Sequence, residues 1–226
     1  MEEVILQLVH VTGKKQRNGF QIVDVTMQLK EGYIYAIAGE NGAGKTTLLE
    51  LIGRENSRYT GNIIFDGMDL KTAHAKAMER IGIISEDCLF FADRTGKENA
   101  AILGDFYEHY EKERFLSYCK RLHVPLHTPY QKMSRGEKIK WQICFAAARH
   151  CRLYMLDEAT AGMDPVFRKT FFDLLHEIMA QTKACILLTD HNLHEISRQT
   201  DYVAYMEHGR LGDWKESMEV EADVWI

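Results

Sequence analysis

The sequence is organised around the stretch from Tyr33 to Thr46, which reads YIYAIAGENGAGKT. The first six of these residues are almost wholly apolar, and such a run predicts a strand that is buried on both faces, as in a parallel sheet. The next eight residues match the pattern G-x-x-x-x-G-K-S/T in full, and the apolar spacing after Lys45 predicts a helix. A buried strand, a glycine-rich loop and a helix in this order predict a phosphate-binding loop.

The residue types in this loop suit the binding of phosphate groups. Glycines allow successive backbone N–H groups to turn toward one anion, and the start of the following helix adds its dipole. Lys45 supplies a positive charge for β- and γ-phosphates, and the Thr46 hydroxyl can bind Mg²⁺. The expected nucleotide-binding residues are Gly39, Glu40, Asn41, Gly42, Ala43, Gly44, Lys45, Thr46 and Thr47. Taken alone, the loop leaves open kinases, GTPases, helicases, recombinases and transport ATPases.

The composition of the chain is that of an ordinary globular protein. The formal net charge of the 226 residues is −5 and like charges form no long block, so nucleic acid is not an expected partner. No apolar run is long enough to span a bilayer and the first residues do not resemble a signal peptide, so we expect the chain to be soluble on its own. Five scattered cysteines without a CxxC pair favour a reduced, cytoplasmic setting and buried thiols.

Further strands are predicted on both sides of the loop, with a helical segment between two of them. The predicted strands cover residues 4–9, 21–27, 81–84, 152–156 and 185–188. Between about 98 and 150 no convincing strand occurs, and apolar residues such as Phe106, Phe115 and Cys119 recur at helical spacing. We therefore expect a mostly helical insertion between two strands of an α/β core.

Two acids, Asp157 and Glu158, follow the apolar strand that precedes them. An acid at the carboxyl end of such a strand reaches the crevice in which a phosphate loop lies. Asp157 is then placed to hold Mg²⁺, and Glu158 suits a general base that orients or deprotonates the attacking water. An acidic turn without catalytic function is the alternative for this pair taken by itself.

Three further motifs resemble those of ATP-binding cassette (ABC) ATPases. Residues 133–138 read MSRGEK and are similar to the LSGGQ signature, residues 161–164 are similar to the D-loop, and His191 is similar to the switch histidine. The order of these motifs agrees with the family over nearly the whole chain. A GTPase would need an N-K-x-D segment, which the sequence does not contain.

The resemblance implies an α/β fold in one domain of residues 1–226. This fold has a P-loop NTPase core with a mostly parallel sheet, an N-terminal antiparallel β subdomain and a helical insertion at about 87–150. It further implies a dimer, with a second copy or another ABC ATPase subunit, that holds two ATP head to tail between the P-loop of one chain and the signature of the other.

Several residues receive a role from this resemblance. His191 is implied beside the γ-phosphate and the attacking water, and Asp164 is the D-loop residue. The signature residues that would meet the partner's ATP are Ser134, Arg135, Gly136 and Glu137. Ser134 also suits the N-cap of a helix by its residue type, and a plain helix cap is the alternative for this position.

The sequence departs from the family pattern at three places. Glu86 stands where a glutamine usually coordinates Mg²⁺, so it is an expected metal ligand beside Thr46 and Asp157, with solvent exposure as the alternative. The same replacement is found in the subgroup resembling bacitracin-resistance and lantibiotic-immunity exporters. Arg135 replaces a glycine and either adds charge near the partner's phosphate or points outward. The usual adenine-stacking aromatic is missing, and Phe20 is the nearest one, so weak discrimination between ATP and GTP is expected.

The resemblance implies an ATP-binding and ATP-hydrolysing subunit of an ABC transporter, and the subgroup likeness favours an exporter. Such a subunit needs a membrane-spanning permease as partner, which would hold it in the cytoplasm at the inner face of the cell membrane. The expected docking surface is residues 88–94, where Phe90 and Phe91 either meet the permease or pack beneath the insertion. The alternative function is a soluble, non-transport ABC ATPase that acts on a macromolecular or cofactor-assembly complex.

Overall fold

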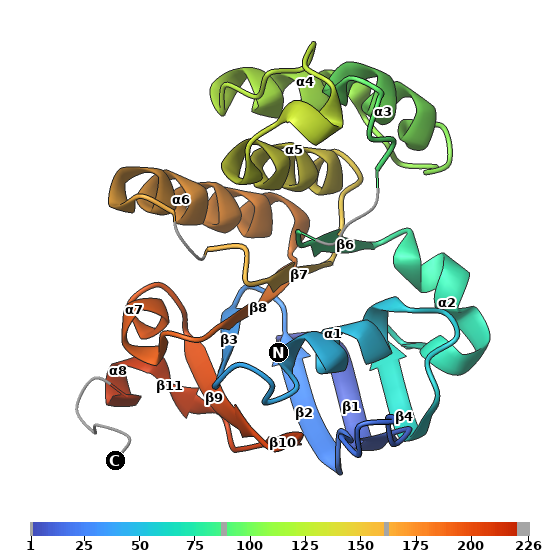
Figure 1. Ribbon diagram of the computed structural model, residues 1–226, viewed down its shortest axis with the longest axis vertical. Helices are drawn as coiled ribbons and strands as arrows, with labels where there is room; N and C mark the ends of the chain where they lie inside the picture. The colour runs from blue at the N-terminus through green and yellow to red at the C-terminus, as the bar shows by residue number, and fades with distance from the viewer. Residues whose placement is uncertain (1, 87–89, 161–162, 221–226) are drawn as a thin grey trace.

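The computed structural model describes residues 2–86, 90–160 and 163–220, which form two β-sheets and the helices that cover them (Figure 1). One sheet is antiparallel throughout and has the strand order β2-β1-β4-β5. Its strands are β1 (Val4–Gly13), β2 (Val25–Lys30), β4 (Tyr59–Phe65) and β5 (Met68–Asp69).

The other sheet has the order β10-β9-β3-β8-β7-β6, and β11 also pairs with β9. All pairs from β9 to β6 are parallel, whereas β10 and β11 run antiparallel to β9. Its strands are β3 (Ile34–Ala38), β6 (Ile81–Ile84), β7 (Leu153–Asp157), β8 (Cys185–Asp190), β9 (Tyr202–Glu207), β10 (Arg210–Leu211) and β11 (Lys215–Glu216). A mostly parallel core with an N-terminal antiparallel sheet confirms the predicted fold class.

The helices fill the connections between these strands. They are α1 (Lys45–Gly53), α2 (Leu70–Met78), α3 (Gly96–Gly104), α4 (Lys112–Arg121), the 3-10 helix η1 (Tyr130–Lys132), α5 (Arg135–Ala147), α6 (Pro165–Thr182), α7 (Leu193–Ser197) and α8 (Ser217–Val220). Helices α3 to α5 lie between β6 and β7 in the sequence and gather at one end of the molecule, as the predicted insertion requires (Figure 1).

Strand β3 is the centre of the fold because each of its faces belongs to a different hydrophobic core. Ile34, Ala36 and Ala38 pack into the core that contains the insertion and α6. Tyr35 and Ile37 pack into the second core, which contains α1 and the inner face of the antiparallel sheet. All five residues of β3 are buried, and none of them has a charged side chain.

The helical insertion has an aromatic core of its own. Trp141 on α5 is fully buried, stacks on Phe145 with a centroid distance of 5.2 Å, and donates its indole N–H to Gly96 O at 2.9 Å. Helix α3 begins with a capping box in which Thr95 and Glu98 satisfy each other's backbone N–H groups. These hydrogen bonds hold the pKa of Glu98 below its ordinary value.

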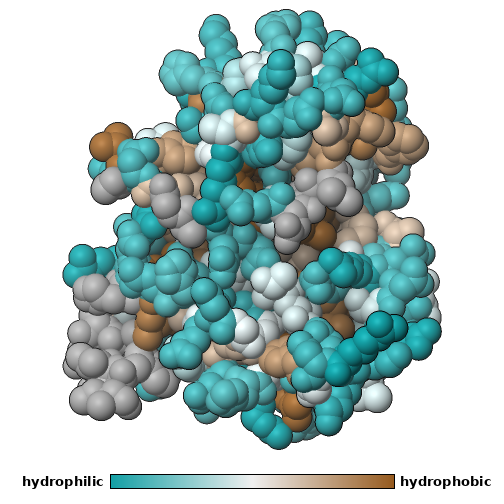
Figure 2. Space-filling model, in the orientation of Figure 1, coloured by the Kyte–Doolittle hydropathy of each residue, from teal (hydrophilic) through white to brown (hydrophobic). Residues whose placement is uncertain are grey.

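The surface facing the viewer in Figure 2 is mostly hydrophilic, and its apolar side chains form small separate groups. No helix in the described ranges is both long enough and apolar enough to cross a membrane.

One residue of the predicted helical pattern, Phe106, lies outside the helices with 76% of its surface exposed. The apolar spacing thus identified the buried face of α4, but the predicted helical pattern begins before the first residue of this helix.

The second predicted strand begins later than expected. Residues 21–24 are not part of β2, which starts at Val25. Asp24 has a positive φ of 53°, and Val23 donates its N–H to Gly209 O at 2.8 Å instead of joining the ladder between β1 and β2. A left-handed residue interrupts an extended strand, so the alternating pattern over 21–27 spans a bend as well as a strand.

Candidate nucleotide-binding and catalytic site

The glycine-rich loop links the carboxyl end of β3 to the first turn of α1, which begins at Lys45. Gly44 is the N-cap of α1 and has φ 113°, a backbone conformation that residues with a Cβ rarely adopt. A Cβ added at Gly44 would also lie 2.6 Å from the ring of Phe20. The glycine is therefore needed for the conformation of the loop and for the approach of Phe20.

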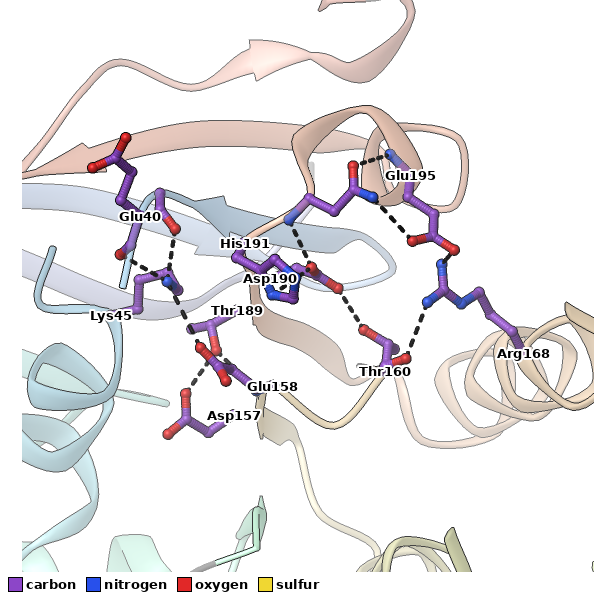
Figure 3. A network of polar contacts seen from close by, with 12 residues as sticks. Glu40, Lys45, Asp157, Glu158, Thr160, Arg168, Thr189, Asp190, His191 and Glu195 are labelled. Atoms are coloured by element: carbon purple, nitrogen blue, oxygen red, sulfur yellow. Dashed lines mark hydrogen bonds and ion pairs between the residues drawn. The ribbon is translucent and has the colours of Figure 1, made fainter. Parts of the chain in front are cut away.

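Lys45 is buried inside the loop, with only 4% of its surface exposed. Its ammonium group donates to Gly39 O at 2.7 Å and to Glu40 O at 3.1 Å. The nearest carboxylate oxygen is Glu158 Oε1 at 3.8 Å from Lys45 Nζ (Figure 3). A buried cation needs such partners, and this one is held in place to meet a further anion.

A surface hollow of about 440 Å³ brings the loop together with Glu158. It is lined by Gln16, Asn18, Phe20, Asn41, Gly42, Gly44, Lys45, Thr46, Thr47 and Glu158. The β1–β2 connection supplies the first three of these residues, β3–α1 supplies the next six, and the end of β7 supplies Glu158. Three segments that are distant in the sequence thus converge where a triphosphate is expected.

Asp157 and Glu158 are both held by Thr189 on the neighbouring strand β8. Thr189 donates its hydroxyl proton to Asp157 Oδ1 at 2.7 Å, and its oxygen accepts the N–H of Glu158 at 3.0 Å. Glu158 itself has a left-handed backbone with φ 47°. Sequence reasoning gave Thr189 no role, although it lies two residues before the switch histidine.

Two of the three residues expected to bind Mg²⁺ share a smaller cleft. Thr46 and Asp157 line this cleft of about 160 Å³ together with Ser85. A hydroxyl and a carboxylate are hard oxygen donors of the type that Mg²⁺ prefers, so these residues fit the ion. Glu86 is placed differently, because its carboxylate pairs with the Arg135 guanidinium and it is not among the residues that line this cleft.

Arg135 joins the insertion to the catalytic segment of its own chain. Besides its ion pair with Glu86, it donates from Nη2 to the backbone oxygen of Glu158 at 3.0 Å. Neither of the two orientations considered from the sequence, toward a partner's phosphate or away into solvent, describes this contact.

The switch histidine lies at the edge of a polar network that joins α6, α7 and the end of β8 (Figure 3). His191 has 57% of its side chain exposed, and its Nδ1 lies 3.7 Å from Asp190 Oδ1. Asp190 is buried, accepts from the Thr160 hydroxyl at 2.7 Å and accepts from the backbone N–H of Asn192 at 2.8 Å.

Arg168 on α6 closes this network. It donates to the backbone oxygen of Thr160 at 3.0 Å and forms an ion pair with Glu195 on α7. The segment that follows Glu158 and the segment that follows His191 are therefore fixed to each other. The residues of this network other than His191 were not predicted, because the charges that pair here are far apart in the sequence.

The signature residues form a second, separate hollow. Ser134 is the N-cap of α5 and forms a capping box with Glu137, with Ser134 N–H donating to Glu137 Oε2 at 2.7 Å. The hollow, of about 380 Å³, is lined by Ser134, Arg135, Gly136, Glu137, Ile139, Lys140, Ala159, Met163, Asp164 and Phe167. None of these belongs to the glycine-rich loop, so the structure brings the signature to Asp164 and not to the P-loop of the same chain.

The two aromatics of the expected docking surface behave differently. Phe90 packs against Trp141 and Tyr130, with centroid distances of 4.8 and 5.0 Å. Phe91 has half of its surface exposed. Residues 88–89 of the same stretch lie outside the described residues.

Comparisons with known proteins agree with this geometry. The sequence profile of the ABC transporter family matches residues 22–161. The ABC transporter ATP-binding protein YtrB of Bacillus subtilis (strain 168) is 30% identical over 198 residues, which are 87% of this chain and 68% of that protein. The methionine import ATP-binding protein MetN 1 of Pseudomonas syringae pv. syringae is 31% identical over 205 residues, or 83% of this chain and 61% of that protein.

A solved structure with the same fold is cbiO1 from Clostridium perfringens, part of the ABC transporter complex cbiONQ. It has a TM-score of 0.80 at 25% identity and covers 98% of this chain and 92% of its own. The fold, the glycine-rich loop and the acids at the end of β7 thus occur together in a chain whose relatives are ABC transporter proteins. This chain belongs to the ABC transporter family and is one of its ATP-binding, ATP-hydrolysing proteins.

Proposed function

We propose that this chain drives a membrane-spanning permease by closing head to tail with a second ATPase subunit around two ATP molecules. The observation that carries this proposal is the separation of two half-sites. Lys45 and Glu158 share one hollow, whereas Ser134 lies in another with Asp164. Each half-site is complete as a local structure, and a second chain can supply the missing half.

The residues around Lys45 suit the hydrolysis of the γ-phosphate. The Lys45 ammonium group would donate to phosphate oxygens in place of the two backbone oxygens. Glu158 would accept a proton from the water that attacks phosphorus. The bond to ADP then breaks, and inorganic phosphate and ADP leave. Mg²⁺, held by Thr46 and Asp157, would neutralise charge on the phosphate oxygens. His191 would contact the γ-phosphate from the β8 side.

The second chain would contribute the start of α5. The backbone N–H groups at a helix N-terminus attract an anion, and Ser134 adds a hydroxyl. In the single chain the Glu137 carboxylate accepts the Ser134 N–H, so binding of the partner's γ-phosphate requires this carboxylate to move. Binding of ATP would then stabilise the closed dimer, and hydrolysis would release it.

The permease is the proposed partner because the related chains named above are ABC transporter proteins, and cbiO1 is part of a complex. We place its docking surface beside the half-exposed Phe91. The chain would then lie at the inner face of the cell membrane. Export is the proposed direction, and it rests on the Glu86 replacement.

A mixing experiment tests the shared site. Lys45→Ala should inactivate the P-loop of one chain and Ser134→Arg should block the signature of another, so neither chain is active alone. In a mixed dimer the P-loop of the second chain faces the intact signature of the first. We expect the 1:1 mixture to regain ATPase activity well above that of either chain alone, and a mixture that remains inactive would contradict the proposal.

A further inference from the structure

Arg135 contacts the catalytic segment of its own chain, although it belongs to the signature. It lies at the first position of α5, and 43% of its side chain is exposed. Its Nε faces the carboxylate of Glu86 after β6, and its Nη2 donates to the backbone oxygen of Glu158 after β7. A single guanidinium therefore connects the insertion to the ends of two core strands.

The two residues of this ion pair are both departures from the family pattern. A glycine at position 135 would reach neither Glu86 nor Glu158, and a glutamine at position 86 would carry no charge. Without the guanidinium, the Glu86 carboxylate would keep its negative charge and lose the cation with which it pairs. The guanidinium of Arg135 balances that charge and holds the carboxylate toward α5, so each replacement compensates the other.

The contact with Glu158 has a second consequence, because the backbone of Glu158 is left-handed with φ 47°. A non-glycine residue in this region is energetically disfavoured and persists only when its surroundings hold it. Thr189 accepts the N–H of Glu158, and Arg135 donates to its carbonyl oxygen. The backbone N–H and the backbone oxygen of Glu158 are thereby both held by hydrogen bonds, and its carboxylate points toward Lys45.

We propose that Arg135 is a positioning residue that acts within its own chain, where it orients Glu158 and neutralises Glu86. The proposal rests on the proposed role of Glu158 as the general base. An exposed ion pair adds little to folding stability, so the loss of Arg135 should affect turnover rather than the fold. A misdirected base lowers kcat while leaving the binding of ATP to the P-loop unchanged.

The first test compares single and double variants of this pair. Arg135→Ala should lower kcat about tenfold or more with KM for ATP within about twofold, and Arg135→Lys should lie between it and the unchanged chain. Glu86→Ala should cost less than threefold, and the double variant should behave like Arg135→Ala. Additive losses in the double variant, or an unchanged kcat in Arg135→Ala, would overturn the proposal.

Arg121 provides a matched control for this series. Its guanidinium pairs with Glu177 between α4 and α6, and its side chain is 44% exposed, close to the value for Arg135. Arg121→Ala should leave kcat unchanged and shift the midpoint of thermal unfolding by about as much as Arg135→Ala does. A similar loss of kcat in both variants would show a structural effect of the insertion rather than positioning of Glu158.

The second test separates action within the chain from action on the partner's ATP. Differently tagged chains allow mixed dimers to be purified. A dimer of Arg135→Ala with Glu158→Gln keeps Glu158 only in the chain that lacks Arg135, so turnover should be low. A dimer of the unchanged chain with the Arg135→Ala, Glu158→Gln double variant keeps both residues in one chain, so turnover should match that of an unchanged chain paired with Glu158→Gln.

The reverse order of these two activities, or equal activities, would overturn the proposal that Arg135 acts within its own chain. Failure of the dimer is recognised separately, because then no mixed species can be purified. In that case the kinetics of Arg135→Ala and its double variant still decide whether Arg135 positions Glu158.

Discussion

The Thr189 hydroxyl donates a hydrogen bond to Asp157 Oδ1 at 2.7 Å, and its own oxygen, Oγ1, accepts the N–H of Glu158 at 3.0 Å. One hydroxyl on β8 thus fixes the two acids that follow β7, the expected metal ligand and the expected base. This relation between neighbouring parallel strands explains why Thr189 is fully buried although it is polar.

Thr189→Val keeps the shape of the side chain and removes both hydrogen bonds. We expect about a tenfold loss of kcat, because the two acids lose their orientation. Unsatisfied partners should also lower the free energy of unfolding by about 1–3 kcal/mol. Thr189→Ser keeps the hydroxyl and should retain most of the activity, so ATPase assays and urea unfolding of both variants check the prediction. Equal activity of the Val and Ser variants would contradict it.

Glu158→Gln removes the base but keeps the size of the side chain. Turnover should fall by about 10² or more, the range for loss of general base catalysis. Affinity for ATP should not fall, because the carboxylate that lies 3.8 Å from Lys45 Nζ no longer competes with phosphate for this cation. Binding of a fluorescent ATP analogue and phosphate release measure the two effects, and near-normal turnover would exclude Glu158 as the base.

Phe20 is the aromatic that lines the phosphate hollow, and its ring lies against Gly44. The β1–β2 connection, which contains Phe20, also contributes Gln16 and Asn18 to the hollow. The sequence identifies neither of these two amides as specific for adenine. We expect KM values for ATP and GTP that differ by less than about threefold, and Phe20→Ala should raise both by a similar factor because ring contacts with a base are sequence-tolerant. A selective loss of ATP hydrolysis would show that Phe20 recognises adenine.

The four described cysteines should be inert toward thiol reagents in the folded protein. Cys119, Cys144, Cys151 and Cys185 are all buried. Burial raises the pKa values of the Cys144, Cys151 and Cys185 thiols, so they stay protonated at pH values where an unfolded cysteine, with a pKa near 8.5, ionises.

In a Cys88→Ser background, Ellman's reagent at pH 8 should label none of these thiols within minutes and all of them in urea. Above about pH 8.5 the thiols of the unfolded chain ionise, whereas the buried thiols of the folded chain stay protonated. This ionisation favours the unfolded chain, so the free energy of unfolding should decline as the pH rises above about 8.5. Rapid labelling of the folded chain would show that these thiols are accessible.

The sequence was sufficient to predict the fold because the features that specify it are local. The apolar run of β3, the glycines that follow it and the apolar strand before Asp157 each occupy a few consecutive residues. The N-cap at Ser134 was also predictable, since Ser134 and Glu137 are three residues apart and form a capping box.

Features that depend on contacts between distant segments were not predictable. The partner of Arg135 lies 49 positions earlier in the chain, at Glu86, and Thr189 is 32 positions beyond Asp157. Both contacts arise only after β6, β7 and β8 align side by side in the parallel sheet. The different environments of Phe90 and Phe91 likewise depend on the position of Trp141 in the folded insertion.

The central claim is that ATP joins the P-loop of one chain to the signature helix of another, and the mass of the Glu158→Gln chain tests it most directly. Light scattering coupled to size exclusion should give the 26.1 kDa of one chain without nucleotide and twice that mass with ATP and Mg²⁺. Lys45→Ala in the same background should keep the single-chain mass. A Glu158→Gln chain that remains at 26.1 kDa with saturating ATP and Mg²⁺, even when the permease is present, would contradict the account.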